Sequence, residues 1–292
     1  KNNVLGKVEP HLPRARDPFC NKKETTPVVF KRPVTEIYNI VVKKSLYMKI
    51  FKTFESFLQE GVNDPGILKA FFMAGGPGSG KSYVAAELFA LPQSDKFQTV
   101  SYDTGLKLVN SDAAFEILLK KNAIDMAKLM SLKDKDPQEW DRAMALRDRA
   151  KKITKGTKEM YIQGRLGMII DGTGKNYGKI EGQVKRLRDL GYDCYMVFVN
   201  TSLEVALERN NARARKLPED MVTKMWDEGQ QNLGKFQRLF KSKRFEIVDN
   251  SEYGDTTPID LVAKEINGFM KQPVSNPIGK QWIETEKEKN KR

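Results

Sequence analysis

The chain has 292 residues, 39% of them hydrophobic and 30% charged, which is enough for one large domain with a buried core. No segment approaches the ~20 consecutive apolar residues that cross a bilayer, and no apolar signal segment opens the chain, so we expect a protein that is neither membrane-embedded nor secreted. The formal net charge of +13 favours anionic partners, such as nucleotides, nucleic acid or an acidic scaffold, without choosing among them.

Histidine and cysteine are scarce. The single histidine, His11, lies among prolines and is expected to be an exposed loop residue. This argues against Ser-His-Asp hydrolysis and against zinc motifs with paired histidines. Cys20 and Cys194 are far apart and form no C-x-x-C pattern, so a reducing cytoplasm is the simplest compartment.

The first 62 residues differ in pattern from the rest. Residues 1–33 contain five prolines and many charges without a helical or strand period, which predicts an extended or disordered basic arm. In 34–62, apolar residues recur at three- and four-residue steps, which predicts an amphipathic helix. Glycine, asparagine, aspartate and proline at 61–66 break that helix before the main domain, 63–271. The C-terminal tail, 272–292, is polar and is expected to be loose.

Strands and helices alternate along the main domain. The expected strands are residues 69–74, 107–109, 167–170, 192–199 and 245–248. The expected helices are 82–89, a helix that begins at the Asp136-Pro137-x-Glu139 cap and passes Ile153, and then 179–190, 203–215, 218–240 and 258–270. This alternation predicts an α/β fold with a mostly parallel sheet flanked by helices. Trp140 and Trp226 fall within apolar helical patterns, so we expect them in the core rather than as platforms for base stacking.

A glycine-rich segment between the first strand and the first helix of this domain matches G-x-x-x-x-G-K-[ST]. It consists of Gly75, Gly76, Pro77, Gly78, Ser79, Gly80, Lys81 and Ser82. Its glycines allow the backbone N–H groups to surround phosphate oxygens, and the helix that follows adds its positive N-terminal end. Lys81 is expected to reach the β- and γ-phosphates, and the Ser82 hydroxyl to bind Mg²⁺. The segment could also be a glycine-rich surface turn, but the flanking strand and helix favour a nucleotide site.

The surroundings of this phosphate loop favour a kinase over a motor or a switch. A hydrolysing motor carries an Asp-Glu pair after an apolar strand, whereas Gly172 follows Asp171 here, and the N-K-x-D motif of GTPases is absent. A kinase needs an aspartate after the second strand to receive the acceptor hydroxyl, and Asp112 stands there. It also needs a mobile arginine-bearing lid, which 208–215 could supply through Arg209, Arg213 and Arg215.

Residues from about 67 to 250 resemble the zeta-toxin and polynucleotide-kinase branch of P-loop kinases. The matching segments, in chain order, are AGGPGSGKS, VNSDAAFE, IIDGTG, LEVALERNNARARKLPEDMV and FEIVDNS. The resemblance implies a P-loop NTPase fold with a five-stranded parallel core, Mg-ATP as phosphate donor and a hydroxyl group as acceptor. Asp171 stands where zeta toxins carry glutamate, and 113–165 matches no acceptor-binding pattern, so the acceptor stays open between a nucleotide-sugar, a nucleic-acid 5′-hydroxyl and another compound.

Each of the remaining site residues has a functional and a structural interpretation. Asp112 is interpreted as the base that accepts the acceptor's proton, although a solvated helix cap is the alternative. Asp171 is placed near Mg²⁺ together with Ser82, although it could merely start a turn. The lid arginines could form a solvated helix face, and Arg209 and Arg213 are four positions apart on the expected helix.

A second resemblance lies at 48–60, MKIFKTFESFLQE, which is similar to the N-terminal peptide that targets internal proteins into the heads of large tailed phages. Leu58-x-Glu60 before Gly61 also fits the pattern cut by prohead proteases. This resemblance implies a phage source, with the protein in the host cytoplasm or inside the virion. The alternative is an amphipathic helix packed on the domain.

Two other functions compete with the kinase. One is an NTPase that remodels nucleic acid or protein, which the missing glutamate after Asp171 disfavours. The other is a packaged phage-head protein with a vestigial nucleotide site.

Overall fold

The computed structural model describes residues 62–64, 66–91, 100–101, 104–213 and 216–289, which all belong to one compact unit, Ile50–Arg292. The predicted arm, the predicted helix 34–62 except its last residue, and the head-targeting-like segment lie outside the described residues. None of the helices in the described part of the chain is both long and apolar enough to span a lipid bilayer.

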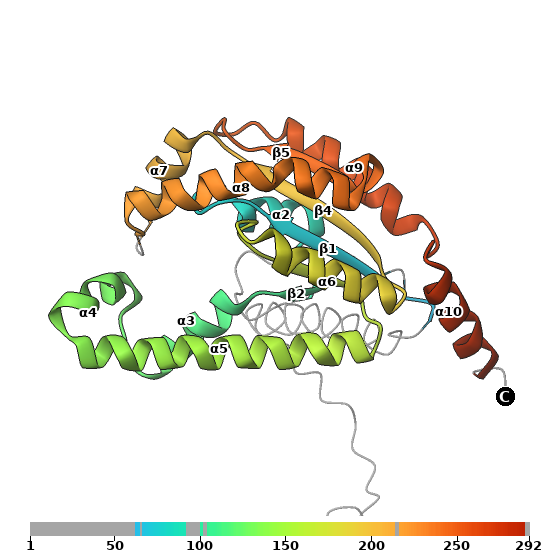
Figure 1. The fold of residues 1–292 in the computed structure, drawn as a ribbon, viewed down its shortest axis with the longest axis horizontal. Coiled ribbons are helices and arrows are strands. Elements are labelled where there is room, and N and C mark those ends of the chain that lie inside the picture. The colour runs from blue at the N-terminus through green and yellow to red at the C-terminus, as the bar shows by residue number, and fades with distance from the viewer. Residues whose placement is uncertain (1–61, 65, 92–99, 102–103, 214–215, 290–292) are drawn as a thin grey trace, which may run out of the picture. The chain divides into compact units, whose positions relative to one another are not determined.

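A five-stranded sheet forms the centre of the domain (Figure 1). Its strands are β1 (Lys69–Ala74), β2 (Lys107–Val109), β3 (Met168–Asp171), β4 (Asp193–Asn200) and β5 (Phe245–Asp249). Neighbouring strands are parallel throughout, in the order β2-β3-β1-β4-β5. The predicted α/β fold is therefore confirmed, and the loops after β1, β3 and β4 all open at one edge, where ligands of open α/β sheets bind.

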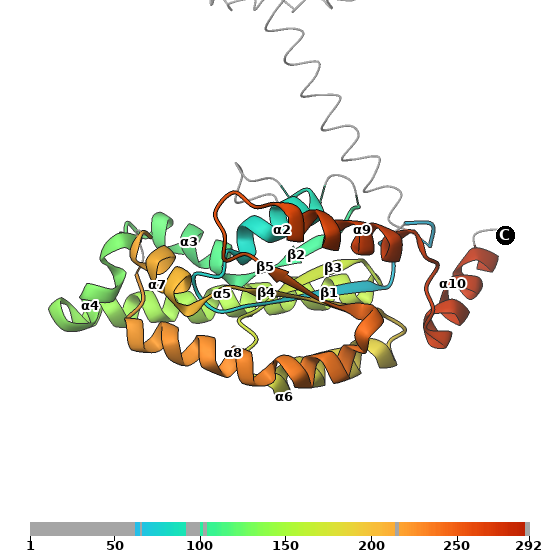
Figure 2. The ribbon, with the colours of Figure 1, turned by 90° about the horizontal axis from the view of Figure 1, so that it is seen from above.

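Helices cover both faces of the sheet, as Figure 2 shows in a view along the plane of the sheet. One face packs against α2 (Lys81–Phe89) and α9 (Thr257–Lys271), and the other against α6 (Tyr177–Asp189) and α8 (Glu219–Phe240). The sequence of β1 explains why helices pack on both faces of the sheet. Its side chains alternate, with Phe71 and Met73 in the α2–α9 cluster and Phe72 in the α6–α8 cluster, so this fully buried strand is apolar on both faces after Lys69.

The long segment between β2 and β3 forms a helical region with its own apolar cluster. It contains α3 (Ser111–Lys121), a 3-10 turn η1 (Met126–Lys128), α4 (Leu129–Lys135) and the long α5 (Pro137–Gln163). Phe115 and Leu129 are buried in this cluster and Trp140 packs against it, as predicted for this tryptophan. The predicted cap of α5 is confirmed, because the Asp136 side chain accepts a hydrogen bond of 3.0 Å from the backbone N–H of Glu139.

The C-terminal tail differs from the prediction of a loose segment. Residues Pro277–Lys289 form a helix, α10, whose Trp282 and Ile283 pack against the main apolar cluster. Its start lies so close to the end of α6 that a Cβ added to Gly279 would lie 2.3 Å from the carbonyl oxygen of Gly191. The polar composition of the segment did not indicate this helix. A helix can pack stably through one apolar stripe and a close backbone contact while the rest of its surface is polar.

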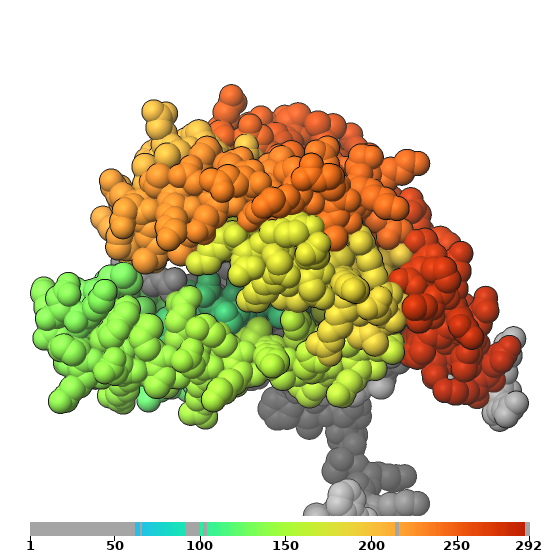
Figure 3. Space-filling view, in the orientation of Figure 1, coloured from blue at the N-terminus to red at the C-terminus, as the bar shows by residue number. Residues whose placement is uncertain are grey.

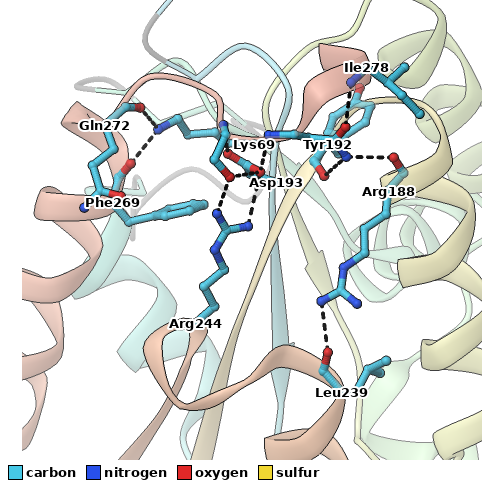
Figure 4. A network of polar contacts seen from close by, with 11 residues as sticks. Lys69, Arg188, Tyr192, Asp193, Leu239, Arg244, Phe269, Gln272 and Ile278 are labelled. Atoms are coloured by element: carbon cyan, nitrogen blue, oxygen red, sulfur yellow. Dashed lines mark hydrogen bonds and ion pairs between the residues drawn. The ribbon is translucent and has the colours of Figure 1, made fainter. Parts of the chain in front are cut away.

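A buried carboxylate fastens α10 to the sheet (Figure 4). Asp193, at the start of β4, is 3% exposed and accepts a hydrogen bond of 3.1 Å from Arg244 Nη1. It also accepts from the backbone N–H and the hydroxyl of Ser275, at 2.6 and 2.9 Å, and from the N–H of Asn276 at 3.2 Å. One side chain thus joins β4, the segment before β5 and the start of α10.

Asp193→Ala should lower the free energy of unfolding by about 3 kcal/mol, because it leaves Arg244 and two backbone donors without their acceptor in a buried site. Urea denaturation measures the difference. Asp189→Ala, an exposed aspartate in α6, is the matched control and should change stability little. Equal effects of the two substitutions would show that the carboxylate does not fasten the tail.

Candidate functional site

The phosphate loop joins the end of β1 to the start of α2, and its glycines are required by the backbone. Gly78 and Gly80 have φ values of +81° and +80°, in the left-handed region. A Cβ added to Gly78 would lie 2.2 Å from the carbonyl oxygen of Ala206, and one added to Gly80 would lie 2.2 Å from Asn250 Nδ2. The loop is therefore held tightly between the segments that follow β4 and β5.

Several polar groups of this loop are available to an anion. Gly80 precedes α2 without a side-chain cap, so the first N–H groups of the helix remain free to meet phosphate oxygens. The Ser79 hydroxyl is buried and has no hydrogen-bond partner among the described residues. Lys81 Nζ donates to the Gly75 carbonyl oxygen at 2.8 Å, so its ammonium group lies over the loop, and Ser82 is exposed. This arrangement fits a bound nucleotide phosphate.

Asn250, which the sequence patterns did not single out, supports the loop from the end of β5. Its side-chain Nδ2 donates to the backbone carbonyl oxygen of Ser79 at 2.9 Å. The backbone carbonyl oxygen of Asn250 accepts a hydrogen bond from Arg209 Nη1 at 2.7 Å. The Arg209 guanidinium also lies 4.7 Å from the ring centroid of Tyr253. Arg209 is thus held beside the phosphate loop. Asn250 could have been recognised from its position directly after a strand, in the segment FEIVDNS that resembles P-loop kinases.

Asp171 ends β3, next to Met73 of β1, and has one satisfied oxygen. Its Oδ2 accepts a hydrogen bond of 3.0 Å from Asn110 Nδ2, whereas its Oδ1 is buried without a partner among the described residues. Burial raises the pKa of Asp171, the positive charge of Lys81 opposes this shift, and the negative charge of Asp112 adds to it. Lys81, Asp112 and Asp171 therefore share one electrostatic environment.

Asp112 lies in the first turn of α3 and is not its cap, so the alternative interpretation as a helix cap is wrong. Asn110 is the cap, because its side chain accepts a hydrogen bond of 2.7 Å from the backbone N–H of Asp112. The Asp112 side chain is 56% exposed and its Oδ1 lies 3.9 Å from Arg147 Nη2. Asn110 thus contacts the Asp171 carboxylate and positions the backbone of Asp112, and its place directly after a strand was the signal for it.

The helix that carries Arg209 ends earlier than predicted. α7 (Leu203–Asn211) ends before Arg213, so the prediction of a helix to 215 is wrong. The buried side chain of Asn210 exchanges two hydrogen bonds with the backbone of Leu217, at 2.9 and 3.0 Å, and so joins the last turn of α7 to the residue before Pro218. Arg213 is exposed and lies beyond the end of α7, off the helical face of Arg209, and Arg215 lies outside the described residues.

Trp226 departs from its predicted place in the core. It is half-buried on α8 and belongs to none of the apolar clusters of the described residues. Its Nε1 donates to the Thr201 carbonyl oxygen at 2.8 Å, and a Cβ added to Gly76 would lie 3.6 Å from its Cα. α8 therefore contacts the phosphate loop through this residue.

A cleft of about 230 Å³ adjoins Asp171. It lies between the ends of β1 and β3, the loop that follows β3 and the first turns of α6. Figure 3 shows this face of the molecule hollowed between α5, α6 and α8. A second, more apolar groove of about 210 Å³ lies between α3 and α5. Of the two, the first cleft is the one lined by a candidate site residue, Asp171.

The predicted magnesium ligands are compatible with the metal but do not form a protein cage. The described residues hold no group of three or more His, Cys, Asp or Glu side chains that could bind a metal. Mg²⁺ beside a nucleotide typically takes one or two carboxylates, phosphate oxygens and waters. The exposed Ser82 hydroxyl and the unpartnered Asp171 Oδ1 suit that coordination.

Asp171→Asn should raise stability at neutral pH, because the amide removes the negative charge whose burial raises the pKa of Asp171. The raised pKa means that the folded protein holds its proton to a higher pH than the unfolded chain, so this carboxylate destabilises the fold increasingly as pH rises from ~4. The gain in the variant should therefore be larger at pH 7.5 than at pH 4 in urea denaturation. A gain that is equal at both pH values, or absent, would contradict the assigned burial.

Comparisons with known proteins agree with this architecture. A family model described as an AAA domain matches residues 71–236, which is over half of the chain. No curated protein gives a significant sequence match. Among solved structures, a Chloroflexus aurantiacus protein assigned as a kinase is 14% identical, covers 70% of this chain and 97% of its own, and has a TM-score of 0.44.

Two further structures are similar at the same level. A chain of the PezAT chromosomal toxin-antitoxin system of Streptococcus pneumoniae is 11% identical, covers 70% of this chain and 87% of its own, and has a TM-score of 0.42. A gluconokinase from Sinorhizobium meliloti is 16% identical, covers 72% of this chain and 95% of its own, and has a TM-score of 0.37.

Proposed function

This chain belongs to the AAA domain family, and we propose that it is a P-loop phosphotransferase that moves the γ-phosphate of ATP to a hydroxyl group. The observation that carries the proposal is that Asn110 joins the Asp171 carboxylate, at the end of β3, to the backbone of Asp112 at the start of α3, at the same edge of the sheet as the phosphate loop. A phosphate-binding cation and a carboxylate for the acceptor proton are the two parts that phosphoryl transfer to an alcohol needs.

ATP would bind with its phosphates in the loop 75–80. The free N–H groups at the start of α2 and the Ser79 hydroxyl face phosphate oxygens, and Lys81 exchanges its hydrogen bond to Gly75 for one to the nucleotide. Ser82 and Asp171 would hold Mg²⁺, which when bound neutralises charge on the β- and γ-phosphates. Asn250 keeps the loop in place during this exchange.

Transfer forms a bond between the acceptor oxygen and the γ-phosphorus and breaks the bond from that phosphorus to the bridging oxygen, which leaves on ADP. The acceptor's proton passes to a carboxylate, and we assign Asp112 to this role. Its side chain is exposed at the edge of the sheet, close enough to Asp171 to raise the pKa of that residue. Asn110 positions Asp112 through the backbone at the start of α3.

Arginines of the segment 208–215 would meet the charge of the transferring phosphoryl group. Arg213→Ala and Arg215→Ala should each lower turnover by about tenfold, or ~1.4 kcal/mol of transition-state stabilisation, with little change in ATP affinity. Steady-state kinetics measures both quantities. Arg149→Ala, an exposed arginine in α5, is the control, and a change of less than about twofold in the Arg213/Arg215 double variant would remove this segment from the mechanism.

Production of ADP in the presence and absence of hydroxyl compounds tests the proposal against its rivals. A phosphotransferase produces ADP at a rate that depends on the acceptor, whereas a remodelling NTPase produces it without one. A vestigial site produces none. Gly172 directly after Asp171 supports the first outcome, since the glutamate that activates water in motors is not there. Membership of the zeta-toxin or polynucleotide-kinase branch, and a place in a phage head, remain predictions.

A further inference from the structure

The cleft after β3 has an apolar floor and a positively charged mouth. Phe72, Ile170 and Ile180 line its interior. Lys175 and Lys179 line its mouth, and both are exposed. Within the described part of the chain, neither ammonium group has an ion-pair or hydrogen-bond partner. The carboxylate that lines the cleft is Asp171, which ends β3 next to Met73 of β1.

A third cation strengthens this charge. Lys158 of α5 places its Nζ 3.5 Å from Oε1 of Gln183, another residue of the cleft. Burial lowers the pKa of Lys158, Glu159 opposes the shift, and nearby positive charges, including Lys179, add to it. Glu159 is itself bound by Arg186 at 2.7 Å, so it does not neutralise the lysines at the mouth. The lysines at the mouth outnumber the one carboxylate that lines the cleft, Asp171, and such an excess of positive charge attracts an anion.

The loop that carries these lysines is held firmly. Asn232, buried on α8, donates from its Nδ2 to the carbonyl oxygens of Gly174 and Lys175, at 3.1 and 2.9 Å. The Asn176 side chain accepts from the N–H of Lys179 at 2.9 Å and starts α6. The backbone of both lysines is therefore fixed before a ligand arrives, which lowers the entropic cost of binding.

We propose that this cleft binds the acceptor by a phosphate group held between Lys175 and Lys179, so that the acceptor is a small phosphate-bearing hydroxyl compound. The proposal rests on the proposed phosphotransferase activity and narrows its substrate class. A lysine pair suits a compact dianion such as a phosphate monoester. A volume of about 230 Å³ is below the ~300–1,000 Å³ of pockets for drug-sized ligands, which favours a small metabolite over a nucleic-acid strand.

Binding of inorganic phosphate tests the site independently of catalysis. The full chain is first saturated with a non-hydrolysable ATP analogue, so that the phosphate loop is occupied, and phosphate is then titrated by calorimetry. The Lys175→Ala/Lys179→Ala double variant should bind this phosphate at least about tenfold more weakly, and higher salt should weaken binding to the parent. Lys185→Ala, an exposed lysine of α6 that does not line the cleft, should bind as the parent does. Absence of phosphate binding in the parent, or an equal loss in Lys185→Ala, would overturn the site.

Transfer assays test the substrate class. A phosphorylated sugar should be a better acceptor than the same sugar without phosphate. The double variant should remove that preference by raising KM with little change in kcat. Equal use of both sugars, or a preference for an oligonucleotide 5′-hydroxyl, would refute the proposal. Phosphate binding without any transfer would support the phosphate site and refute the phosphotransferase activity. Transfer only to neutral acceptors would support the phosphotransferase activity and refute the phosphate site.

Discussion

Lys81→Ala should weaken the binding of Mg-ATP by about 100-fold or more, or ~2.7 kcal/mol, and abolish turnover. Lys81 is the cation of the phosphate loop, and its ammonium group lies over that loop on the Gly75 carbonyl oxygen. Removing it leaves the triphosphate with backbone donors but without the charge that opposes its own. Calorimetric titration with a non-hydrolysable ATP analogue measures the loss.

The fold of this variant should be intact, because the contact described for the Lys81 side chain is one hydrogen bond at the rim of the site. Lys81→Arg separates charge from shape, since it retains the cation but not the compact ammonium group. It should recover part of the affinity and little of the turnover. Unchanged ATP affinity in Lys81→Ala, with the fold preserved, would refute the assignment of 75–82 as a phosphate loop.

Asp112→Asn should lower kcat by about 10²–10⁴, the usual contribution of a positioned base, while ATP still binds. The amide keeps the size of the side chain and removes its ability to accept a proton. The two aspartates differ in surroundings, since Asp112 is exposed near Arg147 whereas Asp171 is half-buried and its Oδ1 is shielded from solvent. Rapid-quench measurement of a single turnover separates the chemical step from product release.

A second variant, Asp171→Asn, distinguishes the residue that accepts the proton from the residue that binds the metal. Asp171→Asn should shift the dependence of the rate on Mg²⁺ concentration, because we place this residue on the metal side. Asp134→Asn, an exposed aspartate of α4, should behave as the parent. Normal transfer by Asp112→Asn together with a dead Asp171→Asn would mean that the base lies on β3 rather than at the start of α3.

The fold was largely predictable because its signals are local. Apolar strands such as 69–74 are bounded by glycine and followed by helices, and this alternation leaves little choice but a parallel sheet. The phosphate loop was equally predictable, since only glycine tolerates the backbone of Gly78 and Gly80 against neighbouring segments. In both cases the residues near in sequence carry the information.

What the sequence did not predict depends on distant contacts. α10 owes its place to Asp193, more than 80 residues earlier, and to the close approach of Gly191 and Gly279. The early end of α7 follows from the two hydrogen bonds between Asn210 and Leu217, which no helical propensity reveals. Polar residues that join separate loops leave no periodic trace in a single sequence.

The site residues show the same division. Lys81 was identifiable from its motif, whereas the supporting role of Asn110, which binds Asp171 and caps α3, requires the ends of two strands to be neighbours. The strand order of the sheet makes these two strand ends neighbours. β2 lies beside β3, although 58 residues separate Val109 from Met168 in the chain. The register between them pairs Val109 with Ile170, one residue before Asp171.

The fate of the γ-phosphate tests the central claim most directly. ATP labelled with ³²P at the γ-position is incubated with the full chain, Mg²⁺ and a small-molecule extract, and the label is separated into inorganic phosphate and organic phosphate. A phosphotransferase places most of the label in a new phosphate monoester, and Asp112→Asn loses that product. Label found only in inorganic phosphate, at the same rate with and without the extract, would contradict the account and identify the protein as a hydrolase.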